Sequence, residues 1–540
     1  MKRIVNNLLM SLFIWSFFVC SSEDDIIDDW IADNTIEPPD SGTPGSLDFS
    51  DYLAVGNSFT AGFADGALYN EAQENNFANL LAGRFAQVDV NVVFNQPDIN
   101  SENGFHTSLN PSGSDQIIGR TILDLSLLSP VPTDGEVIGA YSGDISQLNN
   151  FGVPGLTLSD LETPGYGFPE IGNAFFTRMA ADPATSNVLG DALAVDRSFF
   201  SFWLGYNDYL AYAASGGQGD EPLTTYSTME FGTDLGSALT QLTSDDTPGV
   251  VLDLPPAITL PFFQAVSWDA IELDQATAET LNAGLAGVNS AIQATAIAGY
   301  PGDVNERRIS YSAGANPILV HDEELDDLGP FFEALESAGQ ISSEERASLL
   351  PYEQSRPLVD GELVLLSAGA LINTEADGDT TVLDTPIGIV IPLGFSFTEA
   401  SNGDQYFLNA AEQSAIVTAR ATYNGVINAT VSDLNGAGVD LALVSVQPTF
   451  VDVLGLDEAT AAALALPTAS ADGISGIEID GIILTPDFSP NGIFSTDGIH
   501  PNPRGHGIIT NLIIEVINER WGASVSTIDV LSLKGISFQP

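Results

Sequence analysis

The sequence predicts an α/β protein built around a parallel β-sheet. From residue 51 onward, short apolar runs of strand length alternate with longer stretches in which apolar residues recur every three or four positions. Strands and helices that alternate in this way form parallel sheets, because each helix carries the chain back to the end where the previous strand began. The composition, 44% hydrophobic and 9% aromatic, supplies enough apolar side chain for a sizeable core.

Five buried strands and three long helices are expected. The strands are predicted at residues 52–55, 88–94, 199–204, 250–254 and 439–446. The helices are predicted at residues 274–298, 409–434 and 503–521. Pro503 suits the first turn of the last helix, and Gly522 directly follows its end.

Two long stretches do not fit this alternation. Residues 96–147 are loop-like and rich in Ser, Gly, Asn and Asp, and residues 301–408 contain acidic turns. We interpret both as insertions at the rim of the sheet, where substrate-shaping elements usually lie. The α/β domain is therefore expected in two parts, 47–300 and 409–540, with an insertion or cap between them. That insertion is expected to hold one short helix and two β-like portions, at residues 331–350, 362–371 and 387–397.

The start of the sequence predicts export. Two basic residues precede an apolar run that ends at Cys20, a pattern typical of a secretory signal over residues 1–19 and too short to span a membrane. Cys20 resembles the lipidated cysteine of bacterial lipoproteins, and the acidic residues behind it resemble the tag of Bacteroidetes-type lipoproteins on the outer-membrane surface. Residues 20–46 are expected to be an acidic, flexible linker. The alternative is a plain cleaved signal, because Val19 is bulkier than the usual residue; the protein would then be periplasmic or secreted.

The charge balance disfavours nucleic acid as a partner. Seventy-three acidic and fourteen basic residues give a formal net charge of −59, which repels phosphate backbones. A single cysteine excludes an internal disulfide and a cysteine-based zinc site, and four histidines leave little material for a histidine-rich metal centre. Neither a metal nor a cofactor is expected. Asp377 and Asp379 resemble part of a calcium loop but lack the EF-hand spacing. They are interpreted as solvated, like the acidic run after His321, and His506 is interpreted as structural.

Four segments carry residues suited to nucleophilic catalysis. The first follows the first predicted strand, where open α/β sheets place their sites. There Gly56 permits a sharp turn, and Ser58 begins a helix whose backbone N–H groups can face developing negative charge. The second, residues 150–157, is a glycine-rich turn that could expose further N–H groups. Taken singly, the first segment is explained as well by Ser58 acting as a helix N-cap, and the second as a loop.

The other two segments follow the same logic. Asn207 comes directly after the strand at 199–204, and a neutral amide there can donate to an oxyanion without adding charge. Asp497 lies three residues before His500 in a tight glycine-containing loop, where an acid can orient the imidazole and stabilise its protonated form. Alone, Gly-x-Asn-Asp is a common turn, and a single histidine is more often structural than catalytic.

In combination, these segments resemble the four signature blocks of the SGNH/GDSL hydrolase family. Ser, Gly, Asn and Asp-x-x-His occur in this order, with the acid and base near the C-terminus. The resemblance places Ser58 on the nucleophile, Gly155 and Asn207 on the oxyanion donors, Asp497 on the acid and His500 on the base.

The resemblance implies a three-layer, flavodoxin-like α/β/α fold with strand order 2-1-3-4-5, and a serine hydrolase that needs no cofactor. The backbone N–H groups of Ser58 and Gly155 and the Asn207 side chain would hold the oxyanion. Asn150 also matches the second block, whereas Asn57 stands where the family usually has Asp. Asn57 is expected to shape the nucleophile turn without entering the chemistry. The whole chain is most similar to large SGNH-type lipoproteins of Bacteroidetes.

The expected substrate is a carboxylic ester of a small molecule, a lipid or an acylated glycan. Two alternatives stay open. One is a surface binding protein on the same scaffold that does not catalyse, since a fold does not guarantee activity. The other is a carbohydrate deacetylase instead of a lipase or carboxylesterase. Trp203, Tyr206 and Tyr209 are expected near the site, where they could stack on a sugar or line an acyl groove.

Overall fold

The computed structural model describes most of the chain beyond its first 41 residues. The described residues are 42–105, 118–124, 129–169, 172–217, 226–374, 386–397, 405–467 and 475–539. Cys20, the expected signal and most of the expected linker lie outside them, and so do His106, Asp377 and Asp379. The contacts discussed below belong to one unit of the chain, Pro44–Pro540.

A five-stranded parallel sheet forms the centre of the fold. Its strands are β1 (Tyr52–Gly56), β6 (Asn150–Gly152), β7 (Phe199–Trp203), β8 (Gly249–Leu252) and β15 (Leu441–Val444). They lie in the order β15-β8-β7-β1-β6, and every neighbouring pair is parallel. Numbered along the chain this is the order 2-1-3-4-5, which is compatible with a flavodoxin-like fold. The predicted α/β class and parallel sheet are confirmed.

The second strand of the sheet is not the predicted one. Four predicted strands coincide with β1, β7, β8 and β15. Residues 88–94 form no strand: the helix α5 (Phe77–Val88) ends at the first of them, and the rest form a loop. Val90 and Val93 of this segment are exposed, whereas Val88, Val92 and Phe94 pack against the main core without forming a strand. The place beside β1 is taken by β6, which has only three residues and pairs Ala54 with Asn150. A strand this short is fixed by its partner, not by its own pattern.

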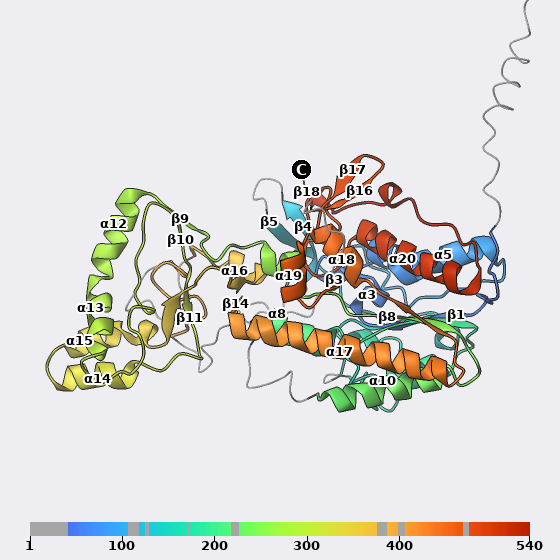
Figure 1. Cartoon of the computed structure of the whole chain (residues 1–540), viewed down its shortest axis with the longest axis horizontal. Helices are drawn as coiled ribbons and strands as arrows, with labels where there is room; N and C mark the ends of the chain where they lie inside the picture. The colour runs from blue at the N-terminus through green and yellow to red at the C-terminus, as the bar shows by residue number, and fades with distance from the viewer. Residues whose placement is uncertain are drawn as a thin grey trace, which may run out of the picture. The chain divides into compact units, whose positions relative to one another are not determined.

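Helices flank the sheet (Figure 1). On one side α5 packs on α20 (Pro503–Trp521). On the other, α17 (Ala410–Gly436) packs on α10 (Thr228–Leu242) and α8 (Asn207–Ala214). The predictions for α17 and α20 are confirmed, including Pro503 in the first turn of α20 and Gly522 behind it with a φ of 64°.

The helix predicted over 274–298 is divided in two. α12 (Gln275–Gly284) and α13 (Ala286–Thr295) are separated at Leu285. Gly284 and Gly287 flank the break, and glycine is among the weakest helix formers. Within the described residues, no helix combines the length and the apolar character needed to cross a membrane.

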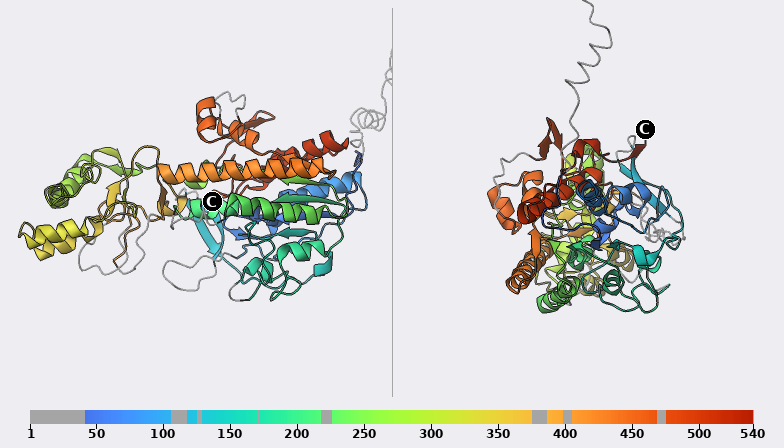
Figure 2. Two further views of the ribbon diagram at one scale, coloured as in Figure 1. Left: turned by 60° about the horizontal axis from the view of Figure 1, so that its bottom comes forward. Right: turned by 90° about the vertical axis from the view of Figure 1, so that its right-hand side faces the viewer.

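Residues 266–408 form a module with hydrophobic clusters of its own. One cluster contains Ile271 and Val364, and another contains Ile292 and Phe332. Because α12 and α13 pack in these clusters, the insertion begins before residue 301, where the sequence placed its start. Its elements lie together in Figure 2. Besides α12 and α13 they are β9 (Ile271–Leu273), β10 (Gly314–Asn316), β11 (Leu319–His321), α14 (Gly329–Ser337), α15 (Ser343–Ser348), η2 (Leu350–Tyr352), β12 (Ser355–Pro357), β13 (Leu363–Val364), α16 (Leu366–Gly369) and β14 (Phe407–Leu408).

Local predictions inside the two insertions needed correction. The helix expected near 331–350 is two helices, α14 and α15, and the β-like portion at 362–371 is the short strand β13 followed by the helix α16. The described residues 387–397 take part only in isolated bridges. The stretch 96–147, expected to be loop-like, contains two antiparallel strands, β4 (Ile118–Asp124) and β5 (Ser129–Asp134). A third strand near the end of the chain, β18 (Phe538–Gln539), pairs with β4.

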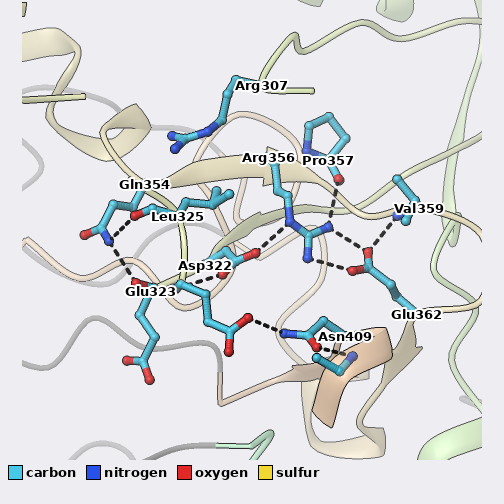
Figure 3. Close-up of polar contacts among 12 residues, drawn as sticks. Arg307, Asp322, Glu323, Leu325, Gln354, Arg356, Pro357, Val359, Glu362 and Asn409 are labelled. Carbon is cyan, nitrogen blue, oxygen red and sulfur yellow. Dashed lines mark hydrogen bonds and ion pairs between the residues drawn. The ribbon is translucent and has the colours of Figure 1, made fainter. Parts of the chain in front are cut away.

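A buried ion-pair network holds the module together (Figure 3). Arg356 of β12 donates to Asp322 at 2.6 Å and to both carboxylate oxygens of Glu362 at 2.6 and 2.8 Å. Burial alone would lower the pKa of Arg356, but hydrogen bonds and the charge of Glu362 outweigh it and raise that pKa. His321 and Asp322 are buried, so the run after His321 is not simply a solvated face. Its Glu324 accepts a hydrogen bond from Asn409, the N-cap of α17.

Shorter elements complete the fold. They are α3 (Ser58–Ala61), β2 (Phe63–Ala64), β3 (Ala67–Leu68), α4 (Asn70–Glu74), η1 (Ile145–Gln147), α6 (Ala174–Thr177), α7 (Val188–Leu193), α11 (Pro261–Gln264), α18 (Gln447–Leu454), α19 (Glu458–Ala463), β16 (Ile477–Ile479), β17 (Ile482–Leu484) and η3 (Val530–Ser532).

The helix α3 lies unusually close to the sheet because β6 carries a glycine. A Cβ atom built on Gly152 would lie 2.2 Å from the backbone nitrogen of Ala61. The Asn150 side chain strengthens this contact by donating to the Thr60 carbonyl at 2.9 Å. Glycine at position 152 therefore permits the approach that sets α3, and Ser58 with it, on the sheet.

We expect Gly152→Ala to lower the free energy of unfolding by about 1–3 kcal/mol, because the added methyl group meets backbone that must shift. The control is Gly236→Ala in the middle of α10, where a Cβ meets no atom within 4 Å. That change should raise the free energy of unfolding by about 0.5–1 kcal/mol through helix propensity. Urea unfolding followed by circular dichroism measures both. Equal effects of the same sign would contradict the packing argument.

Candidate active site

Four of the five residues predicted for catalysis line one cavity. Ser58, Gly155, Asn207 and His500 surround a volume of about 480 Å³. The first three follow β1, β6 and β7, and the fourth precedes α20. The carboxyl ends of parallel strands share one edge of the sheet, so segments distant in sequence meet there.

Ser58 is the first residue of α3 and is not its cap. The N-cap is Asn57, whose side-chain oxygen accepts a hydrogen bond from the backbone N–H of Phe59 at 3.0 Å. The alternative that Ser58 serves only as an N-cap is therefore wrong. Within the described chain the Ser58 hydroxyl makes no hydrogen bond, and the side chain opens onto the cavity. Asn57 has the turn-shaping position that the sequence predicted for it.

Asp497 fixes the ring of His500. Its Oδ2 atom lies 2.9 Å from Nδ1 of His500, and its Oδ1 atom accepts from the backbone N–H groups of Ile499 and His500, each at 2.9 Å. Burial by itself would raise the pKa of Asp497, but the charge of His500 and these hydrogen bonds hold it well below its usual range. Asp497 is thus a carboxylate at neutral pH, able to orient the imidazole and to stabilise its protonated form.

The imidazole of His500 lies among aromatic rings at the edge of the cavity. Its ring centre is 5.5 Å from that of Phe59 and 5.0 Å from that of Phe63. In the described residues no hydrogen bond joins the ring to the Ser58 hydroxyl. Bonds between a nucleophile and its base often tighten only when substrate is bound.

Two of the residues predicted as oxyanion donors are connected by a hydrogen bond, from the Asn207 side chain to the loop that carries Gly155. Gly155 has a φ of +81°, a conformation that favours glycine, and its loop is anchored by Asn173, which donates to the Pro154 carbonyl at 2.8 Å. The Asn207 amide donates one hydrogen to the Leu156 carbonyl at 3.0 Å, which leaves its second hydrogen available. In the described chain, the backbone N–H groups of Ser58 and Gly155 donate to no other group.

Asp208, beside Asn207, does not line the cavity. Its carboxylate accepts from the backbone N–H of Leu158 at 2.8 Å and so holds the loop that follows Gly155. Burial, more than any other effect, raises the pKa of Asp208 to about 6. Of two adjacent polar residues, the amide faces the cavity and the carboxylate anchors a loop.

The walls of the cavity are mainly apolar, but not through the aromatic residues that the sequence suggested. Trp203, Tyr206 and Tyr209 are buried in the core, at 0–1% exposure, and cannot stack on a ligand. The wall is formed instead by residues to which the sequence assigned no role: Phe63, Phe175, Leu210 and Ile499. These side chains surround the space beside Ser58 with hydrocarbon.

Sequence reasoning missed Asp65 and Gly66, which hold the loop of the acid and base. The Asp65 carboxylate accepts from the backbone N–H and the hydroxyl of Thr496, both at 2.8 Å, and from the Tyr69 hydroxyl at 2.6 Å. The Gly66 N–H donates to Asp497 at 2.9 Å. Asp-Gly is a recognisable turn signal, but nothing in it indicates a partner more than 400 residues away.

No metal centre is apparent in the described residues. Among them, no group of three or more His, Cys, Asp or Glu side chains could hold an ion. His506 is buried next to the site and accepts a hydrogen bond from the Phe77 N–H at 3.3 Å. Burial, with a smaller effect of His500, lowers the pKa of His506 to about 3, so the ring is neutral and structural.

Comparisons with known proteins find no match to a family model, to a curated protein or to a solved structure.

If His500 acts as a catalytic base, Asp65→Ala should lower kcat by about 10- to 100-fold, because the loop of Asp497 and His500 loses its anchor. It should also cost about 1–3 kcal/mol in stability by leaving buried donors without acceptors. Asp65→Asn keeps an acceptor oxygen and should restore most of the activity. Kinetics on a p-nitrophenyl ester, with thermal melting in parallel, measure both effects.

The matched control is Asp246→Ala. Asp246 has a φ of 59° against 54° for Asp65, so both substitutions carry the same backbone strain, but Asp246 is exposed. A kcat loss of equal size in both variants would show that backbone strain, and not the carboxylate, causes the effect.

Proposed function

We propose that this protein is a serine ester hydrolase of the SGNH/GDSL type that acts through an acyl-enzyme intermediate. One observation carries the proposal: residues from four separate segments, each chosen from its sequence motif, meet around one cavity, with His500 paired to Asp497. A chance match of short motifs gives no reason for the residues to meet. A scaffold that only binds has no use for a partly buried carboxylate that orients a histidine beside a serine.

The reaction follows from the geometry. The Ser58 Oγ atom attacks the ester carbonyl while Nε2 of His500 takes its proton, since Nδ1 is engaged by Asp497. The oxyanion accepts hydrogen bonds from the N–H groups of Ser58 and Gly155 and from the free hydrogen of Asn207. His500 returns the proton to the leaving alcohol. Water, activated by the same ring, then releases the acid and restores Ser58.

The apolar wall favours an ester whose acyl part is hydrocarbon. Phe63, Phe175 and Leu210 lie beside the nucleophile, where the acyl group of a bound ester would extend. A carboxylesterase or lipase accepting acyl chains longer than acetyl fits this lining better than a dedicated deacetylase. A panel of p-nitrophenyl esters of increasing chain length separates the two.

Ser58→Ala should reduce kcat by about 10⁴- to 10⁶-fold with little change in melting temperature, because the hydroxyl makes no internal hydrogen bond. A fluorophosphonate probe should label the wild-type chain and not the variant. Ser159→Ala, which alters an exposed serine on the loop after Gly155, should retain labelling. Activity above one tenth of wild type in Ser58→Ala would rule out Ser58 as the nucleophile. A wild-type chain that resists the probe would favour the binding protein.

Asn207→Ala should lower kcat by about 10²- to 10³-fold with little change in KM, because the hydrogen bond to the oxyanion strengthens only as charge develops. Asp208→Asn should cost far less and act through the loop after Gly155, since its carboxylate faces Leu158 and not the cavity. Both variants are compared on one ester. If Asp208→Asn is the slower enzyme, the oxyanion donor has been assigned to the wrong residue.

A further inference from the structure

A second cavity, of about 400 Å³, has a mainly polar lining, whereas the cavity at Ser58 is mainly apolar. Five side-chain amides, two carboxylates and two aromatic rings surround it, and it shares no residue with the cavity of Ser58. Its residues come from α4, from the start of α5, from the loop at 94–100 and from Tyr141. Its volume falls within the range of small-molecule sites.

Three polar groups of this cavity form no hydrogen bond within the described chain, although the charge of Arg178 acts on Asp98 and Tyr141. They are the carboxylates of Glu74 and Asp98 and the hydroxyl of Tyr141. Burial and the nearby charge of Asp98 raise the pKa of Tyr141, so its hydroxyl stays protonated and can donate. The cavity therefore offers acceptors and donors that the fold does not use.

The wall of the cavity is rigid although the loop at 94–100 has no helix or strand. The buried side chain of Gln73 donates to the Pro97 carbonyl at 3.3 Å and accepts from the Ile99 N–H at 2.7 Å. Asn76, also buried, donates to the side-chain oxygen of Gln96 at 3.2 Å. These bonds fix the loop before any ligand arrives, which lowers the entropic cost of binding.

A buried arginine joins the two sides of the cavity. Arg178 donates to the carbonyls of Pro97 and Asp98 on one side and to that of Gly139, near Tyr141, on the other. Burial lowers the pKa of Arg178 to about 10, so it is still charged at neutral pH. The hydrogen bonds of Arg178 go to backbone carbonyls, so Arg178 donates none to the Asp98 carboxylate.

The chemistry of the lining selects the class of ligand. Two carboxylates that accept no hydrogen bond from a cation disfavour phosphates, sulfates and uronic acids, although the charge of Arg178 acts on Asp98. The scarcity of apolar wall disfavours lipids. Amides both donate and accept, as sugar hydroxyls do, and carboxylates accept strongly from hydroxyl groups. The ring of Tyr141 adds a flat apolar surface of the kind that the face of a sugar can cover.

We propose that this cavity binds a neutral oligosaccharide. The proposal does not depend on the esterase activity proposed above.

The test measures binding by the full chain carrying Ser58→Ala, so that no ester is turned over. An array of neutral gluco-, xylo-, manno- and galacto-oligosaccharides and N-acetylglucosamine oligomers is screened, and hits are titrated by calorimetry. We expect at least one to bind with a Kd of about 1 mM or tighter. The pocket variant Glu74→Ala/Asp98→Ala should weaken binding by at least about 10-fold, because each carboxylate bond is charge-assisted. Its melting temperature should fall only slightly, because both carboxylates are exposed and accept no hydrogen bond, and only Asp98 interacts with the charge of Arg178.

The control Asp196→Ala/Glu519→Ala removes the same charge from exposed positions outside the cavity and should leave the Kd unchanged within about 2-fold. The proposal fails if no neutral oligosaccharide binds or if the pocket variant binds as well as its parent. It also fails if oligogalacturonate competes equally, or if calcium alone binds in a manner that depends on Glu74 and Asp98. None of these outcomes bears on hydrolysis, which Ser58 variants test separately.

Discussion

Hydrogen bonds from the Asp65–Gly66 turn to the loop of Asp497 and His500 are the contact on which the candidate site depends. They join residues separated by 431 positions, and they act on the acid directly, through the Gly66 N–H, as well as on its neighbour Thr496. The turn itself follows α3, so the segment that carries Ser58 also carries the anchor of its proposed base. Any movement of α3 on the sheet would therefore be passed to both halves of the site.

The inserted module is also tied to this loop. Its neighbour α11 donates from the Phe262 N–H to the Gly498 carbonyl at 3.0 Å, and α11 packs on β13 and α16 of the module. A Cβ atom on Gly498 would lie 2.7 Å from the Phe262 nitrogen, so glycine is needed for that approach. The inserted module therefore supports the loop of Asp497 and His500 indirectly, through its packing against α11.

The two cavities differ in the chemistry of their linings. The one at Ser58 is lined by hydrocarbon and would take an acyl group, whereas the one at Glu74 and Asp98 is lined by amides and carboxylates and would take hydroxyl groups. α4 connects them in sequence, since it follows the Asp65–Gly66 turn and supplies Glu74. Both cavities are lined by short loops and by helices, among them α3 and α8 at the first cavity and α4 and α5 at the second.

The sequence by itself determined the α/β class, four of the five sheet strands, the helices α17 and α20, and the residues that meet at the cavity. These features are local: a buried strand or an amphipathic helix is read from its own residues, and so is a motif. Tertiary structure alone decided that β6 and not residues 88–94 pairs with β1, that Trp203 and Tyr206 are core, and that Asp65 holds Thr496. A three-residue edge strand, an aromatic side chain and a turn each have several stable environments. Which of these environments is adopted depends on residues distant in the chain, and the local sequence pattern does not identify those residues.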